Sequence, residues 1–487
     1  MRTLFTGARI HGTTATALTV EDGVLTWLGD ASAAPQAGPT VELGGAHLAP
    51  AFVDAHVHAT SAGLLRTGLD LTKAESREDV LDAVRDRAGT DEVLWGHGWD
   101  ETRWPDNRPP TRTELDAAAG TTPVYLSRID VHSALASTAL LDRVPAARTA
   151  PGWSDDGPLT RDAHHHVRRQ FGDSITPEQR HAAQLSFLTH AASRGIACVH
   201  ECGGPDITGA QDFADLLAIK GNLPRVIGYW GAVGDAPAGA HGKAGDLFVD
   251  GAFGSRTAAL TRPYTDAPHT SGARYLDAEQ IAAHLVACTE QGVQAGFHVI
   301  GDAAVAEVVA GFQLAEKVVG EQALASTRHR LEHLEMITVE QAAELARFRV
   351  VASVQPLFDA TWGGPAGMYA QRLGPDRAAG LNPFAMLVAQ GLTLAFGSDA
   401  PVTPVDPWAT VDAAVDHRTP GSGLGRDAAF AAHTAGGWAA AGEQGGTLEV
   451  GAPATFAVWR DRTCLRTVLD GTTIYVASEA TRSTEVR

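Results

Sequence analysis

The pattern of apolar and polar positions divides the chain into two β-rich ends and a mixed centre. In the first fifty residues, short runs such as 3–10 and 16–23 are broken by Gly and Asp, which is typical of a meander of short strands. The C-terminal runs 446–461 and 464–477 repeat this texture. We therefore expect one small β-sandwich built from both termini, over residues 1–50 and 436–487.

The centre alternates apolar runs with Ala-rich stretches of helical periodicity, among them 175–194 and 277–291. Strands joined by helical crossovers are the signature of a (β/α)8 barrel. A doubly wound sheet would need a Gly-rich turn after its first strand, and residues 59–68 do not supply one. The sequence predicts an α/β fold with a TIM barrel over residues 51–435. Its eight candidate strands are 50–57, 195–201, 225–230, 246–251, 294–301, 328–335, 350–356 and 393–399.

A long insertion separates the first two candidate strands, at about residues 60–180. It contains strand-like runs of its own, at 93–101 and 123–130. An insertion at the catalytic end of a barrel is a natural lid or pocket wall.

Composition narrows the classes of partner. The net charge of −19 argues against binding a phosphate backbone, which needs a basic face. Four cysteines without regular spacing suit a reducing compartment, and no run approaches the roughly 20 apolar residues of a membrane helix. The N-terminus lacks the apolar core of a signal peptide. We expect a cytoplasmic protein with a small-molecule substrate, no nucleic-acid or membrane partner, and a homodimer as an option.

The first candidate chemistry is the tripeptide His56-Val57-His58 at the end of the first barrel strand. Residues i and i+2 on a strand point to the same face, so the two imidazoles lie side by side. Two imidazoles on one rigid edge are half of a tetrahedral metal site. The alternative is two unrelated histidines near a loop.

Polar residues also stand at the ends of the later strands, where barrel active sites lie. Each one alone is usually a satisfied hydrogen-bonding group, but their recurrence at successive strand ends predicts one shared cavity. In chain order they are His200 and Glu201, Asp246 and Asp250, His298, Glu332 and His333, Gln355, and Asp399.

Longer stretches resemble the amidohydrolase superfamily, and more closely its family 3 branch, which includes N-substituted formamide deformylases. The matching stretches are FVDAHVH, DGAFGSRTAAL, FHVIGDAAV, HRLEHLE, SVQPLF, LTLAFGSDAPVTPVDPW and GTLEVGAPATFAV, which together span nearly the whole chain. The resemblance implies a distorted barrel with a β-sandwich, one or two divalent metal ions, and hydrolysis of C–N bonds.

The resemblance also implies residue roles, because the superfamily carries His-x-His on strand one, His on strands five and six, and Asp on strand eight. His56, His58 and His298 are then expected metal ligands, and His333 either binds a second metal or polarises the substrate carbonyl. Asp399 is expected to act as general base and then acid, and also to touch the metal. The metal, for which zinc is expected, makes hydroxide available near neutral pH.

One departure leaves the metal count open between one and two. Family members commonly carry Lys at the start of strand four, and a carbamylated lysine can bridge two metals. Here that position is Asp246, which cannot be carbamylated. Asp246 itself, or Glu201 at the end of strand two, is the candidate for a further ligand.

Substrate contacts are expected from the insertion and from strand seven. Trp99 either lines a pocket for an apolar substituent or packs the insertion's own core, whereas Trp95 is expected in that core. Arg128 either pairs a substrate carboxylate or pairs Asp130. Gln355 either donates to the substrate carbonyl or bonds to backbone. The run His164-His165-His166 is expected on an exposed helix face without a metal role.

The sequence therefore predicts a metal-dependent hydrolase of amide-like C–N bonds. The first alternative is a deaminase of an aminated heterocycle on the same scaffold. The second is a catalytically silent scaffold, against which the set His56, His58, His298, His333 and Asp399 argues.

Overall fold

The computed structural model describes residues 1–90 and 92–478, and its centre is a nearly closed barrel of parallel strands. The eight-stranded sheet has the order β19-β18-β17-β16-β15-β14-β13-β7. A parallel bridge between Val57 and Ala400 brings the last strand back to the first. The strands are β7 (Phe52–Val57), β13 (Ile196–Gly203), β14 (Arg225–Trp230), β15 (Gly242–Lys243), β16 (Gln294–Val299), β17 (Arg330–His333), β18 (Val351–Val354) and β19 (Thr393–Phe396).

The seam between β7 and the segment after β19 joins residues that the sequence analysis selected as candidates. The backbone N–H of Asp399 donates to the carbonyl of His56 (2.8 Å), and that of His58 donates to the carbonyl of Ala400 (2.9 Å). A Cβ at Gly397 would lie 2.5 Å from the backbone nitrogen of His56, so only glycine permits this approach. Barrel closure therefore brings the His-x-His motif and Asp399 together.

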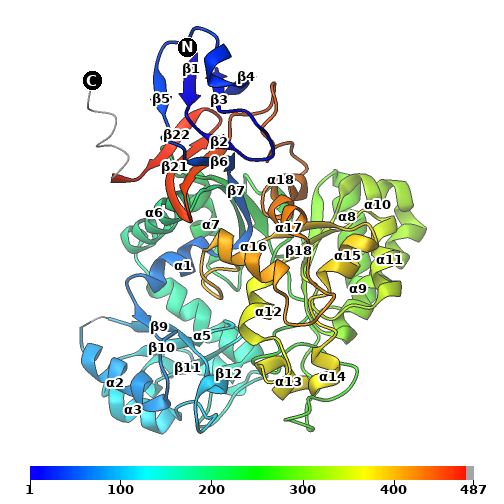
Figure 1. Cartoon of the computed structure of the whole chain (residues 1–487). Helices are drawn as coiled ribbons and strands as arrows, with labels where there is room; N and C mark the ends of the chain where they lie inside the picture. Colours follow the sequence, from blue (N-terminus) through cyan, green and yellow to red (C-terminus); the bar gives the residue numbers. More distant parts are fainter. Residues whose placement is uncertain (91, 479–487) are drawn as a thin grey trace.

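Helices cover the outside of the barrel, and several begin with a capping box (Figure 1). Thr176, Asp277 and Thr338 each accept a backbone N–H three residues on, while a glutamine there bonds back to the cap. These signals explain why the predicted helices start where they do. The outer helices include α6 (Pro177–Ser193), α7 (Gly209–Ala218), α8 (Ala278–Gln291), α9 (Asp302–Val319), α10 (Glu321–Thr327), α11 (Val339–Arg347) and α15 (Phe384–Ala389).

The prediction of the fourth strand was wrong in position. Strand β15 covers only Gly242–Lys243, and residues 246–251 follow it as irregular chain with one bridge, between Phe248 and His298. Gly245 breaks the strand, because its φ of +81° leaves the extended region. Asp246 therefore lies just beyond the strand end rather than at a strand start.

Two sheets built from both termini form the β-sandwich that the sequence predicted. One has the order β4-β3-β1-β5 and the other β2-β6-β20-β21-β22. Their shared apolar core joins Phe5 and Leu18 to Phe456 and Val468. The exact domain limits stay a prediction. The strands are β1 (Thr3–Thr6), β2 (Arg9–Ile10), β3 (Ala17–Glu21), β4 (Val24–Gly29), β5 (Thr40–Glu42), β6 (His47–Pro50), β20 (Phe456–Arg460), β21 (Thr463–Leu469) and β22 (Thr472–Val476).

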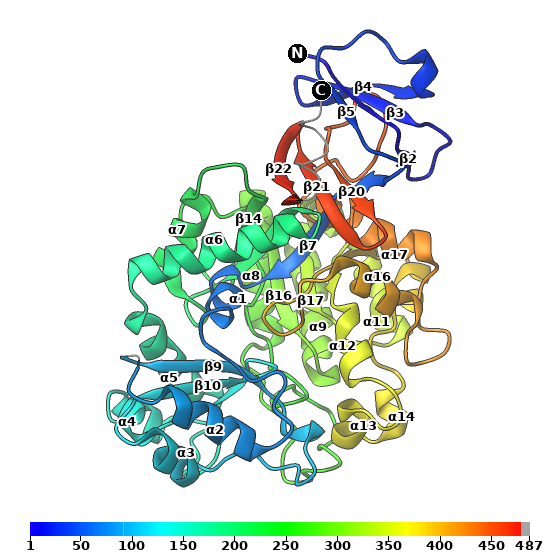
Figure 2. The same cartoon turned by 60° about the vertical axis from the view of Figure 1, so that its left-hand side comes forward.

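The insertion after β7 forms its own five-stranded sheet of order β12-β11-β10-β9-β8. Figures 1 and 2 show this insertion and the terminal sheets at opposite ends of the barrel. Between β7 and the insertion lies the short helix α1 (Ala59–Leu65). The insertion's elements are β8 (Leu69–Asp70), α2 (Arg77–Arg87), β9 (Leu94–Trp99), α3 (Arg112–Ala119), β10 (Val124–Arg128), β11 (Ser133–Ala136), α4 (Thr138–Leu141), β12 (Leu159–Thr160) and α5 (Arg161–Ser174).

After the strand ends come further helices around the mouth of the barrel and beyond it. They are α12 (Pro356–Trp362), α13 (Met368–Leu373), α14 (Pro375–Ala378), α16 (Pro407–Val415), α17 (Arg426–Ala432) and α18 (Ala435–Ala440). Within the described residues, none of the helices combines the length and hydropathy that spanning a bilayer requires.

Candidate metal centre

Five of the predicted site residues meet at the carboxyl end of the barrel. The Nε2 atom of His56 lies 3.4 Å from an oxygen of Asp246 and 3.4 Å from an oxygen of Asp399. The Nε2 atom of His58 lies 3.3 Å from Asp246 and 3.1 Å from Asp399. Across the site, Nε2 of His333 lies 3.9 Å from Asp246. All five side chains are buried.

Several of these buried atoms have no hydrogen-bond partner among the described residues. They include Nε2 of His56, Oδ1 of Asp246 and Oδ1 of Asp399. Such orphaned atoms are rare in protein interiors, because each one costs free energy unless it binds something. Two groups of three bring their ligand atoms close enough for one ion: His56, Asp246 and His333, and His56, His58 and Asp399. Nitrogen and carboxylate donors in this arrangement fit a divalent transition metal such as zinc.

The electrostatics of the site favour positive charge at its centre. Burial alone would lower the pKa of His58, but hydrogen bonds and charge from Asp246 and Asp399 outweigh it and raise that pKa to about 10. For His333 too, burial lowers the pKa, but Asp246 and Asp399 outweigh burial and raise that pKa to about 9. The pKa of Asp246 lies well below its usual value despite burial, because His56, His333 and His58 face it. The carboxylates therefore hold negative charge where a cation would bind.

A buried ion pair behind the site orients His56. Nδ1 of His56 lies 2.9 Å from a carboxylate oxygen of Glu332. Arg330 donates two hydrogen bonds to the same carboxylate, at 2.6 and 3.0 Å, and a third to the carbonyl of Ala55. Holding the far nitrogen of a ligand histidine in this way fixes the tautomer and the ring orientation. The cluster of His56, Cys202 and Glu332 is accordingly not a second metal site, because Arg330 already satisfies Glu332.

His333 is oriented by a side chain from the next strand. Its Nδ1 hydrogen-bonds with Oε1 of Gln355 at 2.8 Å, which leaves Nε2 facing Asp246. Gln355 also donates its amide N–H to the carbonyl of Ser353 (3.5 Å), which is the backbone bond that was one of the two expectations for it. His298 packs beside His333 with ring centres 4.5 Å apart, but its nitrogens belong to none of the close ligand groups.

The two candidates for the further ligand lie in different surroundings. Asp246 faces three histidines of the site, whereas Glu201 accepts the backbone N–H of Ala59 at 2.7 Å. Burial raises the pKa of Glu201 to about 8. Glu201 therefore holds the first turn of α1, directly after His58, and Asp246 is the better placed ligand.

The backbone at the site adopts conformations that few side chains tolerate. His333 has a φ of +70° and Asp399 a φ of +53°. Non-glycine residues in the left-handed region carry a cost that the surrounding structure must offset, and they cluster at functional sites. Here the seam hydrogen bond from Asp399 to His56 holds one of them in place.

A narrow cavity opens onto the site between the barrel and the insertion. The insertion contributes Asp130 and His132, and the barrel contributes His298, His333 and Asp399. Apart from Glu335, the rest of the lining is apolar or aromatic and includes Phe253, Phe358, Trp362, Met368 and Tyr369. His132, which the sequence analysis did not single out as a site residue, lies with its ring centre 5.0 Å from that of His298.

Arg128 is engaged within the protein. Its three guanidinium nitrogens pair with Asp100, Glu101 and Asp130 at 2.9, 2.9 and 2.8 Å. The side chain is 1% exposed, so the geometry favours the pairing with Asp130 over a substrate carboxylate. Asp130 in turn accepts from the hydroxyl of Ser255.

Trp99 takes one of the two positions expected for it, whereas Trp95 does not lie in the insertion's core. Trp99 lies in the insertion's apolar core and donates its indole N–H to the carbonyl of Leu126. Trp95 is only partly buried and lines a second cavity. The expectation of an exposed histidine run was also wrong for His164, which is buried and hydrogen-bonds with the hydroxyl of Tyr125 at 2.9 Å. Periodicity alone did not reveal that strand β10 packs against this face of α5.

Comparison with known proteins places these features in a family. The family model described as "Amidohydrolase family" matches residues 39–475. A Bacillus subtilis (strain 168) protein, "Putative amidohydrolase YtcJ", is 27% identical over 435 residues, covering 82% of this chain and 80% of its own. The Arabidopsis thaliana "Protein LONG AFTER FAR-RED 3" is 26% identical over 427 residues, covering 78% and 70%.

Solved structures agree with the fold. An uncharacterized metal-dependent hydrolase from Pyrococcus furiosus superposes with a TM-score of 0.72 at 25% identity, covering 95% of this chain and all of that one. A second uncharacterized metal-dependent hydrolase, from Pyrococcus horikoshii OT3, has a TM-score of 0.74 at 24% identity, covering 97% of this chain and all of that one. The narrower likeness to formamide deformylases stays a prediction. Because the family model matches residues 39–475, which include the whole barrel and its insertion, the chain belongs to the amidohydrolase family.

Proposed function

We propose that this protein is a metal-dependent hydrolase that cleaves an amide-like, non-peptide C–N bond in a small molecule. The observation that carries the proposal is the set of buried, unpartnered atoms of His56, Asp246 and Asp399, which converge at the carboxyl end of the barrel. Membership of the amidohydrolase family and the likeness to the Pyrococcus furiosus metal-dependent hydrolase support it.

The proposed ligands of the divalent metal, for which zinc is the first candidate, are the site histidines and carboxylates. His56, His58, Asp246 and Asp399 offer atoms around one point, and His333 faces Asp246 from the opposite side. Two close groups that share His56 leave room for one ion or for two. A metal held there would supply activation of water and polarisation of the carbonyl group.

The residues around that point have distinct proposed roles. Asp399 takes a proton from the attacking water and returns it to the nitrogen of the leaving amine as the C–N bond breaks. A carboxylate can contact the metal with one oxygen and serve as base with the other. His333, its ring fixed by Gln355, directs Nε2 toward the substrate carbonyl or toward the metal. Glu332 and Arg330 keep His56 in its binding orientation.

The same arrangement fits a deaminase, in which the attacked carbon carries an amino group and ammonia leaves. The deformylase-like reaction is the other specific form, and it releases formate. We place amide hydrolysis first because the matching stretches in the barrel and at both ends resemble that branch. A cytoplasmic location, action on a small molecule, and the homodimer option remain parts of this proposal.

The test is a hydrolysis panel on purified protein, with formate, amine and ammonia measured separately. N-substituted formamides, acetamides and cyclic amides are compared with aminated heterocycles, before and after chelation and metal return. Amine release that chelation abolishes and metal restores supports the proposal, while ammonia release from heterocycles favours the deaminase. Protein that carries no metal and hydrolyses nothing after zinc or manganese is added would be a silent scaffold.

A further inference from the structure

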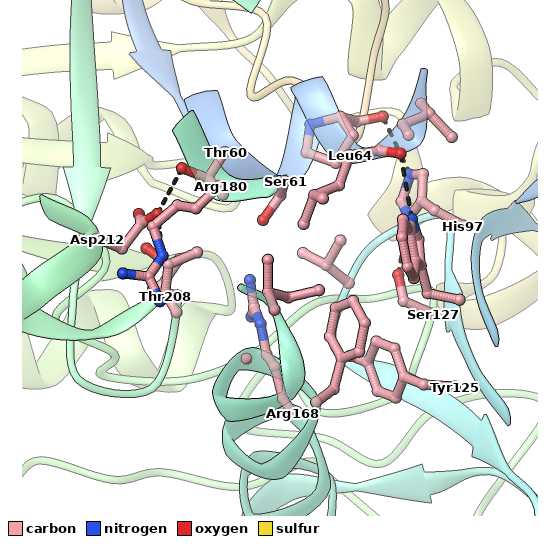
Figure 3. Close-up of a pocket in the computed structure, with 18 of the residues that line it drawn as sticks. Thr60, Ser61, Leu64, His97, Tyr125, Ser127, Arg168, Arg180, Thr208 and Asp212 are labelled. Atoms are coloured by element: carbon pink, nitrogen blue, oxygen red, sulfur yellow. Dashed lines mark hydrogen bonds and ion pairs between the residues drawn. The ribbon is translucent and has the colours of Figure 1, made fainter. Parts of the chain in front are cut away.

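A second cavity lies between the barrel and the insertion (Figure 3). Some of its lining residues are close in sequence to residues of the candidate metal centre. Helix α1, which contributes Thr60, Ser61 and Leu64, begins directly after His58. Pro401, also in its wall, follows Asp399 by two residues. The remaining walls come from β9, β10, α5, α6 and the start of α7. The cavity thus occupies the catalytic end of the barrel, where substrate groups bind.

The walls of this cavity are mainly apolar. Tyr125 stacks on Phe171 with ring centres 4.9 Å apart, and Trp95 lies 6.0 Å from Phe171. Leu64 and Ile175 complete this side. Apolar walls with a few convergent polar groups are the usual form of a small-molecule site.

Arg168 projects into the cavity as a cation without a partner. It stands on α5 and is 8% exposed. Among the described residues, its guanidinium takes part in no hydrogen bond and no ion pair, and Figure 3 shows it rising from α5 into the middle of the cavity. Its guanidinium is therefore placed to form charge-assisted hydrogen bonds with an anion that a ligand brings into the cavity.

The other charged groups near Arg168 are already paired or are neutral. Asp212, the acidic residue of this wall, lies 3.5 Å from Arg180, which also lies 3.2 Å from Asp215. Asp206 lies 3.6 Å from Arg169. Burial, together with the charge of Arg168, lowers the pKa values of His97 and His164, so these two rings add no positive charge. Among the described residues that line the cavity, Arg168 is therefore the cation without a direct acidic partner.

We propose that this cavity binds an apolar arm of the substrate that ends in a carboxylate, with the Arg168 guanidinium donating hydrogen bonds to the two carboxylate oxygens. The planar fork of arginine matches a carboxylate in this bidentate way. The aromatic wall of Trp95, Tyr125 and Phe171 covers the apolar part of the arm. That the ligand is a substrate rests on the proposed function, whereas the binding itself does not.

The test measures binding of 4-phenylbutyrate and of its neutral analogue 4-phenyl-1-butanol to the purified protein by calorimetry. Arg168→Met removes the charge but keeps an apolar side chain, and Arg169→Met is the matched control, since Arg169 is 50% exposed on the same helix. We expect the acid to bind the native protein and Arg169→Met equally, and Arg168→Met about ten- to a hundredfold more weakly, the range of a charge-assisted hydrogen bond. The alcohol should bind weakly to all three.

Several results would overturn the inference. These are equal binding of the acid to Arg168→Met, no binding of the acid to the native protein, or alcohol binding as tight as that of the acid. If the metal centre alone held the carboxylate of 4-phenylbutyrate, the acid would bind all variants alike, which is the first of these results. Melting temperature separates a structural role, because Arg168 lacks a partner among the described residues and Arg168→Met should melt no lower than the native protein; a clear fall contradicts the assignment.

The hydrolysis panel keeps the two proposals distinguishable. For amides that the protein hydrolyses, Arg168→Met should lower kcat/KM for those ending in a carboxylate and not for their carboxamide analogues. If no amide is hydrolysed while acid binding still depends on Arg168, the proposed function fails and the carboxylate subsite stands. If hydrolysis occurs but neither binding nor kcat/KM depends on Arg168, the subsite fails alone.

Discussion

The barrel end and the insertion both bury charged side chains over the active-site region, but they satisfy them differently. At the barrel end, His56, Asp246 and Asp399 direct unpartnered atoms toward one point. In the insertion, Arg128 is fully engaged by three carboxylates, while Arg168 has no counter-ion among the described residues. Buried charge by itself therefore does not mark a site, whereas unpartnered polar groups that converge on one point or face a cavity are candidates for one.

The largest expected effect is on turnover at the barrel end. Asp399→Asn keeps the shape of the side chain but removes the proposed base, so kcat should fall about a thousandfold, within the range of roughly 10² to 10⁴ for general acid–base catalysis. Metal content should be largely retained, because His56, His58 and Asp246 remain. Steady-state kinetics with metal analysis on the same sample check this, and unchanged turnover would remove Asp399 from the base role.

The next largest effect should be a loss of folding stability in the insertion. Arg128→Met leaves Asp100, Glu101 and Asp130 without their shared cation, and breaking a buried ion pair costs about 3–5 kcal/mol. Urea denaturation should show this loss, with metal content per folded chain unchanged. Arg148→Met is the control, because its partner Asp142 is 65% exposed and surface pairs are worth about 0–1 kcal/mol. A loss no larger than that of the control would contradict the structural role of Arg128.

The smallest effect concerns the support behind the metal. Glu332→Gln removes the carboxylate that holds Nδ1 of His56, and such supporting partners are typically worth about 10- to 100-fold in metal affinity. Competition with a chelator measures it. Glu335→Gln is the matched control, since Glu335 is also buried but accepts from Tyr369 and Asn382 rather than from a histidine. Equal metal affinity in both variants would show that Glu332 does not orient His56.

The barrel could be predicted from the sequence because each of its elements carries a local signal. Buried parallel strands read as apolar runs, and capping boxes at Thr176, Asp277 and Thr338 start the helices. The fourth strand was misplaced because DLFVDG, at 246–251, has the composition of a strand. The strand that pairs with its neighbours is β15, which ends at Lys243, before Gly245. Pairing between distant strands decides that position, and a local pattern does not contain it.

The candidate site was predictable to the extent that it lies at strand ends. His56, His58, Asp246, His333 and Asp399 meet because parallel strands end on the same side of the barrel. The choice between Asp246 and Glu201 needed the structure, since only there does Glu201 bind the backbone of Ala59. Arg168 gave no signal in the sequence, because its exposure depends on how the insertion folds over α1.

The most direct test of the central claim is the metal content of the purified protein, measured by mass spectrometry beside that of His56→Ala. His56 belongs to both close ligand groups, so its loss should empty the site more completely than any other single change. We expect at least about one divalent ion per native chain and a large fall in the variant, with the barrel still folded by circular dichroism. The expectation is contradicted if native protein from metal-replete medium contains no metal, or if His56→Ala contains as much metal as the native protein.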